Sequence, residues 1–339
     1  MVLTIVETTL TLAASEAQRR RNAEPAPYYM WALHATDGTR LSRGSGPLEL
    51  VLDPIVSVRN RPNQIGPWFR INSRGYRGGE LRPGSGLRVV VVGGSTAFGT
   101  GVRSDAETFG AALERELGVE VVNSAVIGFM AVQERALLQT ELLGLRPRVV
   151  IALDGWNDLG IGRSSQIHGL LSEAFVQIEL MAMTGAEVNR NVLAALGKMA
   201  SHAFPHTRAL IARLGPHASP GPLSDDYVAH RAAVFAESHA AMAAACEPHG
   251  CRLVTVLQPY RGAVGPYDLF VRQTLAAHRR ADLHVFDASR VLERSSDNFL
   301  DDYHLTAMGN ARLAQAVAPI VRPMLGAQGG GRDDGRGGR

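Results

Sequence analysis

The chain alternates between short, continuous apolar runs and longer segments in which apolar residues recur every three or four positions. The runs are typical of strands buried on both faces of a parallel sheet, and the spaced segments are typical of amphipathic helices. The clearest run is 87–92, which contains four consecutive valines, and the clearest helical spacing is 107–117, which ends at Gly118. The same reading predicts further strands at 119–122, 148–153, 252–257 and 283–286, and helices at 132–143, at 227–246 and around Leu313, Val317, Ile320 and Leu325.

Strands that alternate with helices predict an α/β fold, in which a mostly parallel sheet is covered by helices on both faces. In such sheets ligands bind beyond the carboxyl ends of the strands. Polar residues gather at this position, because Ser95, Asn123, Asn157, Gln258 and Asp287 come just after successive predicted strands. We therefore expect the functional site at that edge of the sheet.

The remaining segments suggest a division of the chain into several parts. We expect an N-terminal segment at 1–24, an irregular, partly β extension at 25–84, one α/β domain at 85–326 and a disordered Gly/Arg tail at 327–339. Within the α/β domain, residues 160–222 are rich in Leu, Met and Ala and too long for an ordinary connection, so we predict a helical insertion. Two roles are open for it: a lid over the site, or an extension of the core or a dimer contact.

Composition argues against two classes of partner. The net charge is only +3, the basic residues are almost all arginine, and no basic face with interleaved aromatics marks a nucleic-acid footprint. Residues 1–7 lack a basic start, carry Glu7 and are too short for a span of about 20 apolar residues. We therefore expect no clear membrane span and a cytoplasmic protein. A membrane-associated or exported form is the alternative, because residues 8–14 precede three consecutive arginines.

The cysteines and histidines do not indicate a metal site. Cys246 and Cys251 lie close in sequence and are expected to be two free thiols, with a disulfide as the alternative. His202 and His206 have the spacing of one helical turn, but Pro205 between them disfavours a regular helix and no partner acid is evident. No cofactor is expected.

Ser95, Asp301 and His304 form a candidate catalytic set. Ser95 follows a strand and two glycines, where the lack of Cβ atoms allows a tight turn and lets a substrate approach the backbone. Asp301 precedes His304 by three positions, so both side chains can emerge on one side of a turn into a helix, with Thr306 as its N-cap. A serine hydroxyl needs an imidazole to take its proton and a carboxylate to fix the imidazole tautomer, and these three residues supply that set.

Two further residues are candidate donors to a developing oxyanion. Gly128 follows the second strand of the α/β domain, where its backbone N–H is free of side-chain obstruction, and Asn157 follows the third with a neutral amide. Taken singly, each motif is also explained by a turn or a cap. Their joint occurrence in order, at the carboxyl ends of successive sheet elements, favours the catalytic explanation.

With these motifs the chain resembles the SGNH hydrolases of the GDSL esterase/lipase superfamily. The matching blocks are Gly93 to Thr96, Asn123 to Gly128, Gly155 to Asp158 and Asp301 to His304, and the segment Asn72 to Arg77 also looks like one found ahead of the domain in some members.

The resemblance implies a flavodoxin-like three-layer α/β/α sandwich with a mostly parallel sheet. It further implies Ser95 as nucleophile, His304 as general base and then acid, and Asp301 as the orienting carboxylate. The oxyanion hole would comprise the Ser95 and Gly128 amides and the Asn157 side chain. One departure is visible, because Gly94 replaces the Asp that often precedes the serine.

The function we predict is hydrolysis of a carboxylic ester through an acyl-enzyme, with a small-molecule, glycan or lipid ester as substrate. Competing nucleotide motifs and the Gly-x-Ser-x-Gly elbow do not fit residues 93–101. Two alternatives remain open: an O-acyltransferase that uses the same triad, and a catalytically silent carbohydrate-binding module of the same fold. The acyl length, the alcohol half and the oligomeric state are not encoded in these motifs.

Overall fold

The computed structural model describes most of the predicted α/β domain and the extension before it. The predicted segment 1–24, the insertion at 160–222 except Gly160, and the tail at 327–339 lie outside the described residues. The residues described are 48, 50–53, 55–84, 86–160, 223–262 and 265–326.

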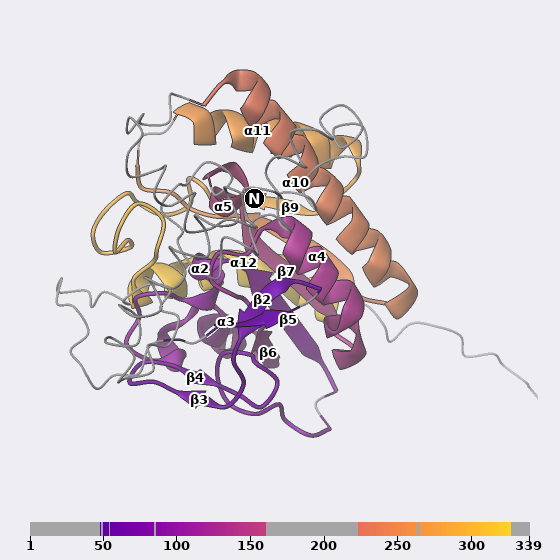
Figure 1. Cartoon of the computed structure of the whole chain (residues 1–339), viewed down its shortest axis with the longest axis vertical. Coiled ribbons are helices and arrows are strands. Elements are labelled where there is room, and N and C mark those ends of the chain that lie inside the picture. The colour runs from indigo at the N-terminus through magenta and orange to yellow at the C-terminus, as the bar shows by residue number, and fades with distance from the viewer. Residues whose placement is uncertain are drawn as a thin grey trace, which may run out of the picture.

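A five-stranded parallel sheet forms the centre of the molecule (Figure 1). Its strand order is β6-β5-β7-β8-β9, the order of flavodoxin-like folds, so the predicted fold class is confirmed. Each predicted strand is present: the strand at 252–257 has the predicted boundaries, and the boundaries of the other four are shifted by one or two residues. The strands are β5 (Arg88–Gly93), β6 (Glu120–Asn123), β7 (Val149–Asp154), β8 (Arg252–Leu257) and β9 (Val285–Asp287).

Helices cover both faces of this sheet. One face carries α3 and α12, the other carries α4 and α10, and Figure 1 shows α4 and α10 side by side. Two short helices, α2 and α5, follow β5 and β7 directly. The helices are α2 (Ser95–Phe98), α3 (Phe109–Leu117), α4 (Ala131–Thr140), α5 (Trp156–Gly160), α10 (Asp225–Cys246), α11 (Gly265–Arg280) and α12 (Ala307–Gly326), with 3-10 turns at Asp105–Glu107, Leu142–Leu145 and Glu247–His249.

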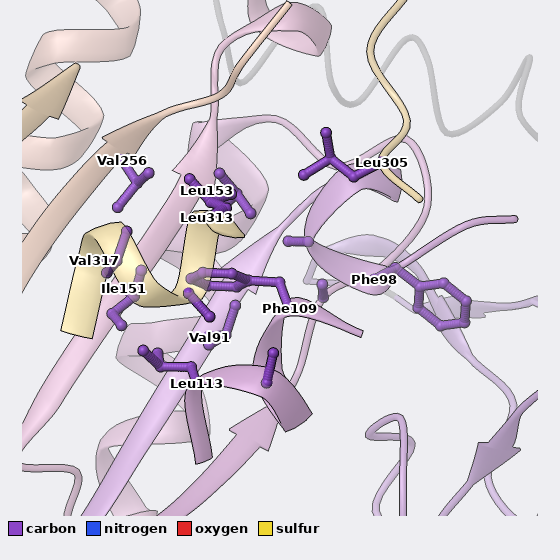
Figure 2. Close-up of a cluster of buried hydrophobic side chains, with 14 of the residues drawn as sticks. Val91, Phe98, Phe109, Leu113, Ile151, Leu153, Val256, Leu305, Leu313 and Val317 are labelled. Atoms are coloured by element: carbon purple, nitrogen blue, oxygen red, sulfur yellow. The ribbon is translucent and has the colours of Figure 1, made fainter. Parts of the chain in front are cut away.

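The valine run of β5 divides between the two faces, because successive side chains of a strand point in opposite directions. Val89 and Val91 belong to the cluster under α3 and α12, whereas Val90 and Val92 belong to the cluster under α4 and α10. Figure 2 shows the first cluster, in which side chains from α3 and α12 meet those of the sheet. The continuous apolar run is therefore needed, since the strand is buried on both faces.

Helix boundaries follow local hydrogen bonding more closely than apolar spacing. The helix predicted from residue 107 begins at Phe109, because the Thr108 hydroxyl accepts a hydrogen bond from the Ala111 amide at 3.2 Å and caps it. It ends at Gly118, whose φ of 71° is left-handed, as predicted. The helix predicted to reach residue 143 ends at Thr140, and a 3-10 turn continues the chain.

Helix α11 is not among the sequence-based predictions. Its buried positions are Tyr267, Phe270, Val271, Thr274 and His278, which recur at helical spacing. The apolar pattern of this helix is weak in the sequence, because two of its five inward-facing residues are the polar Thr274 and His278. With α10 and α5, this helix forms a third apolar cluster, which includes Leu257 at the carboxyl end of β8.

The extension before β5 consists of two small antiparallel pairs, β1 (Leu50–Asp53) with β2 (Ser57–Asn60) and β3 (Gln64–Ile65) with β4 (Arg70–Ile71). A bridge between Arg77 and Asn123 joins it to the edge strand β6, and the Arg77 amide donates to the Asn123 carbonyl at 2.9 Å. This contact covers an edge that would otherwise present unpaired backbone groups.

Two further sequence-based expectations concern thiols and membranes. Cys246 and Cys251 are buried and free, as predicted, and the Cys251 thiol points at the Cys246 carbonyl at 3.4 Å. Within the part of the chain that the structure describes, none of the helices combines the length and the apolar character needed to span a membrane.

Leu313 of α12 provides a test of this core, because its side chain is fully buried between α3 and the sheet (Figure 2). Leu313→Ala should lower the free energy of unfolding by about 2–5 kcal/mol, through lost burial and the cavity left behind. Met308→Ala on the same helix is the control, since Met308 is 48% exposed and should change stability by less than about 1 kcal/mol. Urea denaturation measures both, and equal losses would contradict the assigned packing.

Candidate active site

Two glycines allow the chain to turn directly from β5 into α2, whose first residue is Ser95. Gly93 has a φ of +149°, and a Cβ on it would lie 2.6 Å from the Leu153 carbonyl oxygen and 2.4 Å from the Ala97 side chain. No other residue fits this position without moving the backbone. The turn places Ser95 at the carboxyl edge of the sheet, where the sequence predicted the site.

The structure brings Ser95, His304 and Asp301 together, although 209 positions separate Ser95 from His304. His304 Nε2 lies 2.9 Å from Ser95 Oγ, and His304 Nδ1 lies 2.6 Å from Asp301 Oδ2. A carboxylate only accepts hydrogen bonds, so in the neutral ring the proton sits on Nδ1 and the Nε2 lone pair faces the serine hydroxyl. This is the arrangement that activates a serine as a nucleophile.

The environment of Asp301 keeps its carboxyl ionised. Partial burial raises its pKa, but hydrogen bonds from the His304 ring and from the backbone amides of His304 and Tyr303 outweigh burial, and the pKa lies below its ordinary value. The carboxylate therefore stays charged at neutral pH and holds both the ring and the backbone of the turn that carries it.

Several contacts fix the turn that carries His304. The Thr96 hydroxyl donates to the Tyr303 carbonyl at 3.1 Å, so the residue after the serine is bonded to the residue before the histidine. The Trp156 ring stacks on the rings of Tyr260 and Tyr303, with centroids 4.7 and 5.5 Å away, and the Tyr303 ring lies 4.4 Å from that of His304. None of these roles was predicted, because neither Thr nor an aromatic residue carries a recognisable spacing there.

The two further predicted oxyanion donors lie after β6 and β7, Gly128 in a loop and Asn157 in the first turn of α5. Gly128 has a φ of +84°, and the Asn157 amide donates to the carbonyl of the next residue, Phe129, at 2.8 Å. A Cβ on Gly94 would lie 2.2 Å from that amide nitrogen, so Asn157 is packed against the backbone just before Ser95. The amide has a second N–H that remains for a ligand. The Ser95 amide lies at the start of α2, where N–H groups lack intrahelical partners.

A group of buried acids, Asp154, Asp158 and Glu134, lies in and around the start of α4 and α5. The Asp158 carboxyl accepts from the Ala131 amide at the start of α4, at 3.2 and 3.3 Å, and burial raises its pKa to about 8. Glu134 of α4 is fully buried, and burial together with the nearby Asp154 raises its pKa well above its ordinary value. Apolar spacing gave no hint of these groups. In the described part of the chain, no three acids, histidines or cysteines are arranged to hold a metal, and His202 and His206 lie outside it.

One protein family and several solved structures are similar to this chain. The sequence model of the GDSL-like lipase/acylhydrolase family matches residues 91–312, well over half of the chain. Among solved structures, a lipase/acylhydrolase from Enterococcus faecalis is 12% identical, with 70% of this chain and 97% of that chain covered and a TM-score of 0.42. A catalytic mutant of an acetylxylan esterase from Geobacillus stearothermophilus is 13% identical, with 72% and 96% covered and a TM-score of 0.41. No curated protein matches the sequence.

Gly94→Ala tests the packing of Asn157. The added Cβ would displace the Asn157 amide and break its bond to Phe129, so reaction of Ser95 with an organophosphonate should slow by about 100-fold, the loss typical of one oxyanion donor. Gly144→Ala is the matched control, because a Cβ there meets nothing within 4 Å. Intact-mass kinetics measure both rates, and an unchanged rate in Gly94→Ala would contradict the predicted role of Asn157.

Glu134→Gln tests the buried acids through the pH dependence of stability. Because the folded-state pKa is raised, the folded state holds a proton that the unfolded chain loses above about pH 4.3, so this group destabilises increasingly as pH rises. Between pH 5 and 8 the free energy of unfolding should therefore fall less steeply in Glu134→Gln, by up to about 1.4 kcal/mol per pH unit.

Urea denaturation across that pH range provides the measurement. The exposed Glu293→Gln should keep the parent slope and serves as the control. A slope in Glu134→Gln equal to that of the parent would show that Glu134 is ionised in the folded protein.

Proposed function

The chain belongs to the GDSL-like lipase/acylhydrolase family and is a hydrolase of ester bonds, and we propose that it acts as a serine esterase that forms an acyl-enzyme on Ser95. The observation that carries this proposal is the chain of hydrogen bonds from Ser95 Oγ through the His304 ring to the Asp301 carboxylate. It supplies a nucleophile, a base and an orienting group at the expected edge of the sheet.

In the first half of the reaction, Ser95 Oγ attacks the ester carbonyl carbon while His304 Nε2 takes the hydroxyl proton. The tetrahedral intermediate collapses as the imidazolium returns that proton to the leaving alcohol, which leaves the acyl group on Ser95. Water then attacks the acyl-enzyme with His304 as base, and the acid is released with Ser95 restored. Asp301 keeps its charge throughout and stabilises the imidazolium.

The oxyanion would be held by three donors that follow the carboxyl ends of β5, β6 and β7. They are the Ser95 and Gly128 amides and the Asn157 side chain, whose position is fixed by Phe129 and Gly94. Donors fixed before the reaction stabilise the developing charge without reorganisation, which is the largest single contribution in many acyl-transfer enzymes.

For the substrate we propose a small acyl ester or an O-acylated sugar or lipid. The half-buried ring of Tyr303 beside His304, and the half-buried Trp156 ring stacked on it, support this class, because aromatic surfaces pack well against acyl chains and against the apolar faces of sugar rings. A chain-length series of esters ranks these candidates directly.

Substitutions at the site should separate the nucleophile from the oxyanion donor. Ser95→Ala should lower kcat for p-nitrophenyl esters by about four to six orders of magnitude, whereas Asn157→Ala should lower it by about two to three. The difference arises because loss of the nucleophile removes the covalent route, while loss of one donor only weakens the hold on the oxyanion.

Intact mass after treatment with a fluorophosphonate gives an independent measurement. The parent and the control Ser104→Ala, whose side chain caps no helix, should each gain one adduct, and Ser95→Ala should gain none. Product masses in the presence of sugar or alcohol acceptors then distinguish hydrolysis from transfer. If the parent neither hydrolysed p-nitrophenyl esters nor gained a fluorophosphonate adduct, the proposed esterase activity would be contradicted. Acyl transfer in excess of hydrolysis would contradict it as well.

A further inference from the structure

Arg77 carries a buried charge that no step of the reaction uses. It lies in the extension, ahead of the family match, and only 2% of its side chain is exposed. Its guanidinium donates from Nη1 to the carbonyls of Phe98 and Gly99, both at 2.8 Å, and from Nη2 to the carbonyl of Trp68 at 3.0 Å. Nε donates to Asp105 at 3.0 Å. A buried guanidinium with this many acceptors is fixed in place, and the loss of any of these hydrogen bonds costs stability.

Two of the carbonyls that Arg77 binds, those of Phe98 and Gly99, lie at the end of the short helix that begins with Ser95. Helix α2 has four residues, and four backbone hydrogen bonds close its single turn. The Phe98 amide donates to Gly94 at 2.9 Å, the Gly99 amide to Ser95 and Thr96 at 3.0 and 3.1 Å, and the Thr100 amide to Ser95 at 3.0 Å. One helical turn is not stable by itself, and its last carbonyls have no intrahelical partners. The geometry of Ser95 therefore depends on groups outside α2.

Asn123 completes the set of donors at this helix end. Its side-chain amide donates to the Ala97 carbonyl at 3.0 Å, while its backbone carbonyl accepts from the Arg77 amide at 2.9 Å. Together, Arg77 and Asn123 provide donors for three successive carbonyls after Thr96. The Phe98 ring also lies under the guanidinium, with its centroid 4.6 Å from Cζ.

The loop that presents Arg77 is itself held by Asn72. The Asn72 carboxamide oxygen accepts from the amides of Arg74 and Tyr76, at 2.9 and 3.0 Å, and its nitrogen donates to the Gly79 carbonyl at 2.9 Å. The segment Asn72 to Arg77 is therefore a compact, hydrogen-bonded turn that fixes the position of Arg77.

We propose that Arg77 is a positioning residue for the nucleophile: from the extension it holds the carboxyl end of α2 and so sets the direction of Ser95 Oγ toward His304. This proposal rests on the proposed serine mechanism. The planar guanidinium meets its four acceptors as a fixed fork, whereas the single ammonium of lysine cannot bind the Phe98 and Gly99 carbonyls and Asp105 in the same directions. Arg77 is in this way a part of the active site that the family match does not include.

Arg77→Lys and Arg77→Met test the proposal, with Arg59→Met as the matched control. Arg59 lies in the same extension and pairs with Asp53 and Glu141, away from α2. In both Arg77 variants we expect kcat and the rate of fluorophosphonate labelling to fall about 10- to 100-fold while KM changes less than about twofold, because misplacement by about 1 Å slows a reaction on this scale. Arg59→Met should keep both rates even where its melting temperature falls.

Chemical rescue adds a readout that a loss of stability would not produce. Arg77 is one of the residues that line a cavity of about 400 Å³, and we expect a small cation to enter from it the space that Arg77→Ala leaves. Guanidinium chloride at non-denaturing concentration should restore labelling of this variant several-fold, whereas sodium chloride at equal ionic strength should not.

The outcomes separate the two proposals. A parent that is not labelled refutes the proposed function, and the positioning role with it. A labelled parent with Arg77 variants that react at the parent rate, at whatever melting temperature, overturns the positioning role alone. If the Arg77 variants do not fold, Asp105→Ala decides, because it removes the partner of Nε: slower labelling with KM unchanged supports the role, and the parent rate overturns it.

Discussion

The close approach of β5 and β7 at their carboxyl ends is the constraint on which the rest of the site depends. Gly93 pairs with Leu153, and a Cβ on it would lie 2.6 Å from the Leu153 carbonyl oxygen. Because no side chain fits there, the position requires glycine, and glycine also allows the turn that presents Ser95 at the sheet edge. Gly94, one residue later, leaves room for the Asn157 amide. The proposed nucleophile and the proposed oxyanion donor are thus placed by close contacts with the backbone, in an interior that is densely packed.

The same constraint explains the departure from the usual motif. In this chain a residue with a Cβ at position 94 would push against the Asn157 amide, whose nitrogen would be 2.2 Å away. Hydrogen bonds to groups outside the turn hold it: the Asn123 side chain donates to the Ala97 carbonyl, and the Thr96 hydroxyl donates to the Tyr303 carbonyl. Buried polar networks of this kind specify one geometry when every member is satisfied.

The sequence predicts the sheet well because its strands are buried on both faces and carry unbroken apolar runs. It predicts which residues reach the carboxyl edge for the same reason, since strand ends fix the register of Ser95, Gly128 and Asn157. Helix α11 and the buried acids Glu134 and Asp158 were not predicted, because inward-facing polar residues interrupt the apolar period that makes a helix recognisable. Three of the four acceptors of the Arg77 guanidinium are backbone carbonyls, which leave no trace in a pattern of residue types.

The extension is better described as part of the catalytic fold than as an appendage to it. Phe69 and Ile71 belong to the same apolar cluster as the helices on one face of the sheet, and Val58 and Tyr76 belong to the cluster on the other. The Asn60 amide, fully buried, donates to the carbonyl of Ala125 in the loop that leads to Gly128, at 3.1 Å. These contacts include both faces of the sheet, the loop that leads to Gly128 and the end of α2. Removing the extension would therefore expose the core and remove contacts that hold the site in place.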